Sequence, residues 1–115
     1  MAAAGHNDRY DALLARLQIH FTDQALLVQA FTHRSYVAEV EGMASNERLE
    51  FLGDAVLDLI IAEALYRTHS DWPEGELTKT KAAAVGERSL EMIARGWRVG
   101  PYMRISHGEE LSGGR

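Results

Sequence analysis

Residues 46–68 combine an almost continuous set of apolar side chains with a single line of acids, a pattern that strongly restricts how the chain can fold. On a helix, which turns 100° per residue, Glu47, Glu50, Asp54 and Asp58 fall within about 80° of one another. Apolar side chains occupy nearly every other direction around this helix. Because a helix that is apolar on almost all sides is normally buried, we expect the acids to lie against a core or an interface.

The acidic line has two interpretations. Carboxylates one turn apart repel each other, and desolvation adds to the cost unless a cation neutralises them. A divalent metal such as Mg²⁺, which takes one or two carboxylates together with water and phosphate oxygens, would provide that charge. Alternatively, the acids form the exposed edge of an amphipathic helix whose dipole favours negative charge in its first turns. Periodicity alone leaves both interpretations open.

The composition is that of a globular protein, with 115 residues, 46% hydrophobic and 25% charged, which indicates one domain or part of one. No apolar run approaches the roughly 20 residues that span a bilayer, and the first residues lack the features of a signal peptide. The chain has no cysteine, so it contains neither a disulfide nor a thiolate metal site. We therefore expect a cytoplasmic protein without a membrane partner.

The apolar spacing and the capping residues predict an all-α fold, a helical bundle. The expected helices begin after Asn7 or Asp8, after Thr22 and after Asn46 (the last ending near Thr68), and cover residues 76–84 and 89–97, with a loop at 39–45 and an irregular tail at 106–115.

Several single residues carry further expectations. No second His or Cys stands at ligand spacing from His33, which favours a structural hydrogen-bonding role over metal binding or general base catalysis. Gly53 within a helix suggests that another backbone approaches closely. We expect Lys79 and Lys81 to point outward, and Asp58 to be a polar or salt-bridge residue.

The string NERLEFLGDAVL at residues 46–57 resembles the signature of the ribonuclease III family, the Mg²⁺-dependent endonucleases that cut double-stranded RNA. Residues 32–36, THRSY, are similar to a second family motif, and the resemblance extends over about residues 8–115. It implies the ribonuclease III endonuclease-domain fold, a homodimer, Mg²⁺ with Mn²⁺ as a substitute, and a role in processing ribosomal and messenger RNA precursors. The formal net charge of −5 argues against a basic RNA-binding footprint, but the cleft of a metal-dependent nuclease must itself be acidic.

The resemblance also implies roles for individual residues. Glu50 and Asp54 match the metal-binding acids of the family, and Asp54 is the expected catalytic residue. Glu47 matches an acid of the same cleft, and Glu74 matches another that the family dimer brings near the site. Phe51 projects about 60° from the acidic line, and we expect it to pack against a second copy.

Residues 108–115 are similar to the family's linker before its last acidic helix, and nothing in this sequence corresponds to the Asp and Glu ligands of that helix. We therefore expect residues 1–115 to be an incomplete nuclease domain, without the double-stranded RNA-binding domain, that does not cut RNA alone. Two alternatives stay open: a catalytically inactive RNA-binding relative of the same fold, and a helical interaction module. An inactive relative would be expected to lose the acids that this chain retains.

Overall fold

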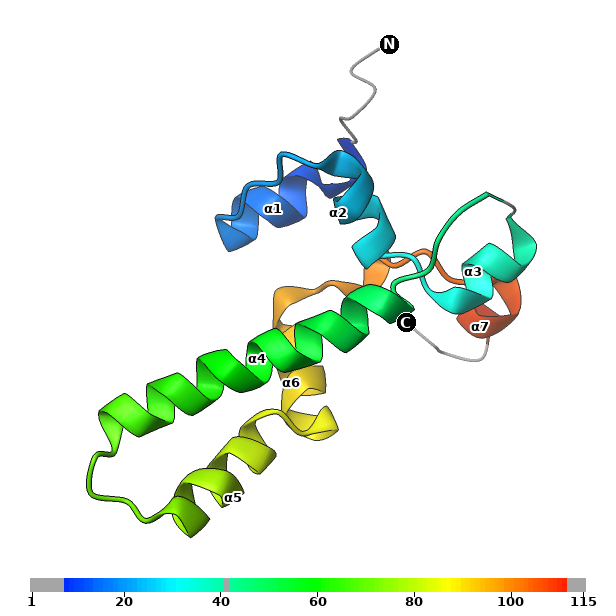
Figure 1. Ribbon diagram of the computed structural model, residues 1–115. Helices are drawn as coiled ribbons and strands as arrows, with labels where there is room; N and C mark the ends of the chain where they lie inside the picture. Colours follow the sequence, from blue (N-terminus) through cyan, green and yellow to red (C-terminus); the bar gives the residue numbers. More distant parts are fainter. Residues whose placement is uncertain (1–7, 41, 112–115) are drawn as a thin grey trace.

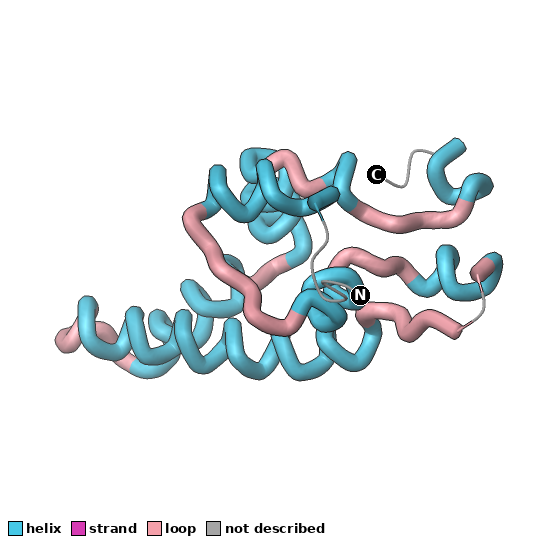
Figure 2. The backbone as a smooth tube through the Cα atoms, turned by 90° about the horizontal axis from the view of Figure 1, so that it is seen from above, coloured by secondary structure: helices cyan, strands magenta, loops and turns pink. Residues whose placement is uncertain are grey.

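The computed structural model describes residues 8–40 and 42–111, which form helices joined by short loops and contain no strand (Figures 1 and 2). In chain order the elements are the 3₁₀ helix η1 (Asp8–Tyr10), α1 (Asp11–Leu17), α2 (Gln24–Ala30), α3 (Arg34–Glu39), α4 (Glu47–Thr68), α5 (Glu74–Ala84), α6 (Glu87–Trp97), the 3₁₀ helix η2 (Gly100–Tyr102) and α7 (His107–Leu111). The all-α prediction is confirmed. None of the described helices is long and apolar enough to cross a membrane.

The molecule is elongated, because α4 and α5 form a long hairpin that extends away from the other helices (Figure 1). Its dimensions are 53 × 32 × 24 Å and its radius of gyration is 16.9 Å, whereas a compact chain of this length has a value of about 13 Å. The hairpin therefore exposes much of its surface to solvent.

The buried core lies at the opposite end from the tip of the hairpin, among η1, α1, α2 and the segment that follows η2. Its fully or almost fully buried residues are Tyr10, Leu13, Leu27, Thr32 and Ile105. The Tyr10 ring stacks on Phe31 with a centroid distance of 5.0 Å. Arg104 Nε donates a hydrogen bond to the Tyr10 hydroxyl at 3.3 Å, and this bond raises the pKa of Arg104 above its ordinary value.

Three chain segments meet beside this core. Thr32 and Arg104 form an isolated parallel bridge. The Arg104 backbone N–H donates to the Phe31 carbonyl at 2.7 Å, and the His33 N–H donates to the Arg104 carbonyl at 2.9 Å. The Asn46 N–H donates to the Thr32 carbonyl at 2.9 Å. The residues that precede α3, α4 and α7 are thus held together at one point.

The predicted helix ends differ from the structure where short-range capping decides them. Thr22 is wrong as the cap of α2, because the Asp23 carboxylate accepts a hydrogen bond from the Leu26 N–H at 3.2 Å. The helix expected at 76–84 starts at Glu74, after Pro73, and the helix expected at 89–97 starts at Glu87, after Gly86. Asn7 lies outside the described residues.

Two short helices are missing from the prediction. Helix α3 begins after His33, whose ring accepts a hydrogen bond from the Ser35 N–H at 3.1 Å. The tail expected to be irregular contains α7, and the Ser106 hydroxyl accepts a hydrogen bond from the Glu109 N–H at 3.0 Å. Ser106 and Glu109 form the Ser-x-x-Glu pattern of a capping box, which is the sequence feature that would have predicted α7.

The largest correction concerns the burial of α4. None of its residues is buried, and Phe51 is 82% exposed. Of the two surroundings expected for this helix, a core is wrong for the chain on its own, because the core forms elsewhere and α5 is the helix most extensively packed along α4. The other, an interface, stays a prediction. Apart from the adjacent backbone of α4 itself, nothing in the described chain lies within 4 Å of the position that a Gly53 Cβ would take, so the expected close approach of another backbone is absent there.

Candidate active site

The acids of the first half of α4 are accessible to solvent. Glu47, Glu50 and Asp54 are exposed, and Asp58 is intermediate. Glu50 and Asp54 are four residues apart, which places them about 6 Å apart along the helix axis on the same face. Their exposure gives solvent, ions and a large substrate direct access to both carboxylates.

The start of α4 is defined by two residues with different roles. The sequence predicts Asn46 as the N-cap, and its position is confirmed, but its side chain makes no capping hydrogen bond. The Ser45 hydroxyl instead accepts from the Glu47 N–H at 3.3 Å and donates to Glu47 Oε1 at 3.1 Å. Ser45 therefore orients the first acid of the line, a role that the sequence interpretation missed.

Asp58 pairs with Lys81 of α5, with its Oδ1 atom 3.7 Å from the Lys81 ammonium. The expectation of a salt-bridge role for Asp58 is confirmed. The expectation that Lys81 points outward is wrong, because its side chain lies against α4. The pair connects the two helices of the hairpin. Because Asp58 already has a protein cation as its partner, its role differs from that of the three acids nearer the start of α4.

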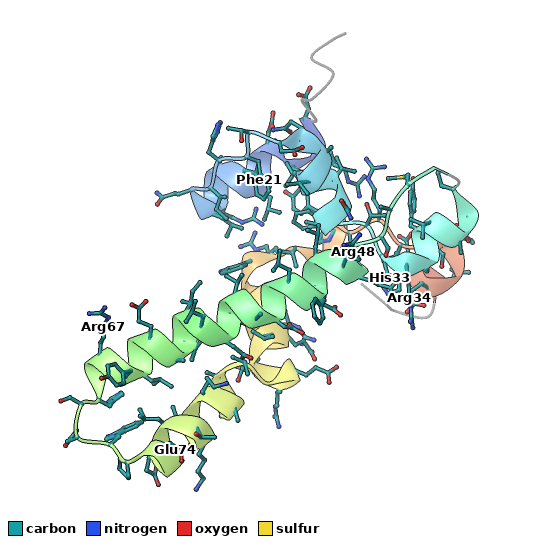
Figure 3. All side chains as sticks on the ribbon, in the orientation of Figure 1. Phe21, His33, Arg34, Arg48, Arg67 and Glu74 are labelled. Carbon is teal, nitrogen blue, oxygen red and sulfur yellow. The ribbon has the colours of Figure 1, made fainter. Side chains whose placement is uncertain are left out.

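Glu74 lies far from the other acids within this chain. It begins α5 at the tip of the hairpin, at the opposite end from Arg48 in the first turn of α4 (Figure 3). Its carboxylate accepts a hydrogen bond from the Thr78 hydroxyl. The structure thus brings Glu47, Glu50 and Asp54 together on one helix and does not bring Glu74 to them.

Phe51 belongs to an open groove beside the acidic line. The groove has a volume of about 640 Å³ and is lined by Gln29, Glu47, Arg48, Leu49, Phe51 and Leu52. Its apolar and charged sides are adjacent, so a surface that covers Phe51 would also border the carboxylate of Glu47.

His33 has a structural role, as expected. Its Nδ1 atom lies 2.8 Å from the Ser35 hydroxyl and accepts from the Ser35 N–H, so the ring caps α3. The Ser35 hydroxyl also accepts from the Ser106 N–H at 2.9 Å. The THRSY motif therefore holds the chain segments beside the core and contributes no ligand to the acidic line.

The donor set suits part of a divalent metal site. Oxygen ligands are those that Mg²⁺ prefers, and it binds through one or two carboxylates with water and phosphate in its other positions. Glu50 and Asp54 fit this description. In residues 8–40 and 42–111 no group of three or more His, Cys, Asp or Glu side chains is arranged to hold a metal ion. Two carboxylates are fewer protein ligands than such a group of three, so Glu50 and Asp54 do not make a complete metal site within the described residues.

Comparisons with known proteins agree with this arrangement. A model of the family described as ribonuclease-III-like matches residues 23–115. Ribonuclease 3 of Streptomyces coelicolor is 54% identical over 93 residues, which are 81% of this chain and 34% of that protein. Ribonuclease 3 of Desulforamulus reducens is 49% identical over 111 residues, which are 95% of this chain and 45% of that protein. The chain spans about a third to a half of the length of these curated relatives.

The fold also matches a solved structure, the nuclease domain of ribonuclease III from Campylobacter jejuni, described as flexible in a region involved in dimer formation. The TM-score is 0.84 at 41% identity, and the match covers 91% of this chain and 71% of that one. The resemblance inferred from residues 46–57 is confirmed by both kinds of comparison. The chain therefore belongs to the ribonuclease-III-like family.

Proposed function

We propose that the protein containing this chain is a Mg²⁺-dependent endonuclease of the cytoplasm that hydrolyses double-stranded RNA, including precursors of ribosomal and messenger RNA. The observation that carries the proposal is the exposed line of Glu47, Glu50 and Asp54 on the first half of α4. The names of the relatives, Ribonuclease 3, support the same reaction.

The reaction assigns distinct tasks to these side chains. When bound, a pair of Mg²⁺ ions, or Mn²⁺ in their place, would supply an activated water and would stabilise the negative charge that develops on the phosphodiester oxygens. Glu50 and Asp54 would hold the metal, with Asp54 as the catalytic ligand. Glu47, oriented by Ser45, would lie at the edge of the same cleft. The helix fixes the separation of the carboxylates, so they need little rearrangement when the metal and the phosphate arrive.

Glu50 and Asp54 would fill only a few of the coordination positions of the metal, so other groups must supply the remaining ligands. We propose that further Asp and Glu ligands come from a segment outside these 115 residues. The coverage supports this, because the chain accounts for 71% of the solved nuclease domain to which it is similar. An open pair of carboxylates binds Mg²⁺ weakly, since Mg²⁺ loses its water reluctantly.

We also propose that the active protein is a homodimer in which Phe51 packs against the second copy. A large apolar side chain that is 82% exposed beside a groove is typical of a protein interface. The dimer would bring a Glu74 to the cleft, as the family resemblance implies, although Glu74 is remote from Asp54 within one chain. The Campylobacter jejuni nuclease domain supports this, because it has a region involved in dimer formation.

A cleavage assay with two proteins tests the proposal. The 115-residue chain and the full-length protein are each given the same end-labelled RNA duplex with Mg²⁺, with and without EDTA. We expect the full-length protein to cut and the isolated chain to leave the duplex intact, because its half of the metal site cannot hold two ions. EDTA should stop the cleavage.

Each contrary result has a clear meaning. A full-length protein that binds the duplex without cutting it would favour the inactive RNA-binding relative. One that neither binds nor cuts the duplex would favour the helical interaction module. Cleavage by the isolated chain that disappears in Asp54→Asn would contradict the proposed division of the metal ligands.

A further inference from the structure

The two residues that precede α4, Ser45 and Asn46, are held against the end of α2 and the residues that follow it by three hydrogen bonds. The Gln29 side-chain amide donates to the Ser45 carbonyl at 3.1 Å. The Asn46 side-chain amide donates to the Ala30 carbonyl at 3.1 Å. The Asn46 backbone N–H donates to the Thr32 carbonyl at 2.9 Å. Asn46 makes two of the three bonds, one with its side chain and one with its backbone.

Asn46 does not use its side chain as N-cap residues normally do. A capping Asn, Asp, Ser or Thr accepts a hydrogen bond from a backbone N–H of the first turn through its side-chain oxygen. The Asn46 side chain makes no such bond, and its nitrogen donates across to another helix. Ser45 caps Glu47 instead. The Asn46 side chain therefore binds α2 and not the first turn of α4.

This connection links the acidic line to the buried core. Thr32, whose carbonyl receives the Asn46 N–H, is fully buried. Helix α4 has no buried residue, and neither does α5, along which it packs most extensively. The α4–α5 contact thus fixes the shape of the hairpin, while the bonds of residues 45 and 46 attach its base to the core.

Asn46 also connects directly to a proposed metal ligand. Its carbonyl accepts the first helical hydrogen bond, from the Glu50 N–H, at 2.8 Å. A displacement of residue 46 would therefore move Glu50, and with it the relation of Glu50 and Asp54 to groups supplied by the rest of the protein.

We infer that Asn46 is a positioning residue for the metal-binding acids, acting through its side-chain N–H donor to the Ala30 carbonyl. This inference rests on the proposed function. The positioning role requires a side chain at position 46 that carries a hydrogen-bond donor and is as long as asparagine. Aspartate and serine are equally good N-caps, but aspartate has no donor and the serine hydroxyl is too short to reach the Ala30 carbonyl.

The test compares Asn46→Asp and Asn46→Ser with wild type in the full-length protein. A Mn²⁺ titration followed by electron paramagnetic resonance gives metal affinity, and cleavage of a labelled duplex gives kcat and KM. We expect each substitution to weaken Mn²⁺ binding and to lower kcat by about 10- to 100-fold, the range seen when residues that orient metal ligands are changed. KM should change little, because Asn46 is not proposed to contact RNA.

The direction of the change in Mn²⁺ affinity in Asn46→Asp distinguishes a positioning role from the electrostatic effect of the added charge. An added carboxylate near the acidic line would by itself attract cations and tighten Mn²⁺ binding, whereas positioning predicts weaker binding. Gln24→Glu is the matched control. Gln24 also donates a side-chain amide bond to a backbone carbonyl, that of Phe21 at 2.9 Å, so this substitution makes the same chemical change away from the site. It should leave Mn²⁺ affinity and kcat at wild-type values.

Three results would overturn the inference: wild-type Mn²⁺ affinity in Asn46→Asp, equal losses in Gln24→Glu, or loss of helical circular dichroism in both Asn46 variants but not in the control. The last would assign Asn46 a general role in folding. If wild type itself does not cut the duplex, the proposed function fails. If wild type cuts and Asn46→Asp behaves identically, only the positioning role fails.

Discussion

Asp54→Asn is expected to abolish cleavage of double-stranded RNA by the full-length protein and to leave its affinity for RNA nearly unchanged. Asparagine keeps the shape of aspartate and removes the charge that a divalent metal needs. Metal ions contribute several kcal/mol of transition-state stabilisation in such reactions, so the rate should fall by at least about 100-fold. Single-turnover cleavage of a labelled duplex, together with a gel-shift titration, measures both quantities.

Asp58→Asn provides the control for this experiment, because it makes the same chemical change one turn further along α4. Asp58 already pairs with Lys81, and both side chains are partly exposed, 51% and 32% respectively. Exposed pairs of this kind contribute at most about 1 kcal/mol to stability. Asp58→Asn should therefore cut within a few-fold of wild type. Cleavage by Asp54→Asn within several-fold of wild type would refute its assignment as a metal ligand.

Phe51→Asp is expected to convert the full-length protein from a dimer into a monomer. The Phe51 side chain is 82% exposed in the single chain, so the substitution costs the folded monomer little. A charge buried in an apolar interface without a partner costs far more. Light scattering over a range of protein concentrations measures the effect, and circular dichroism should show that the helices remain.

Met92→Asp is the matched control for the dimer experiment. Met92 is also largely exposed, at 69%, but it belongs to α6 and lies outside the groove beside the acidic line. We expect this variant to stay dimeric. A Phe51→Asp protein that forms dimers of unchanged affinity would show that the interface lies elsewhere on the molecule.

The long helix could be predicted from the sequence because three signals agree over its length. The apolar pattern extends without a break, Asn46 stands at its start, and the acids follow one face. The observed bounds, Glu47–Thr68, match the prediction. Helices α3 and α7 have six and five residues, too few to establish a period, and their ends depend on the His33 ring and the Ser106 hydroxyl.

The candidate site was predictable only where it lies within one helix. Helical geometry alone places Glu47, Glu50 and Asp54 on a shared face. The distance of Glu74 from that face depends on how far α5 extends along α4, and the contact of Lys81 with Asp58 depends on the same packing. The bonds from Gln29 and Asn46 join residues 16 positions apart in sequence, and no local pattern indicates them. The exposure of α4 could not be predicted either, since its apolar periodicity is that of a buried helix.

The most direct test of the acidic line as a metal site is the anomalous scattering of Mn²⁺ in crystals of the full-length protein. We predict an anomalous peak bonded to carboxylate oxygens of both Glu50 and Asp54, at the oxygen-ligand distances expected for such an ion, and its loss in crystals of Asp54→Asn. A crystal soaked in Mn²⁺ that shows no peak at these carboxylates, with Glu50 and Asp54 instead covered by a dry apolar contact, would contradict the proposed nuclease and favour a helical interaction module.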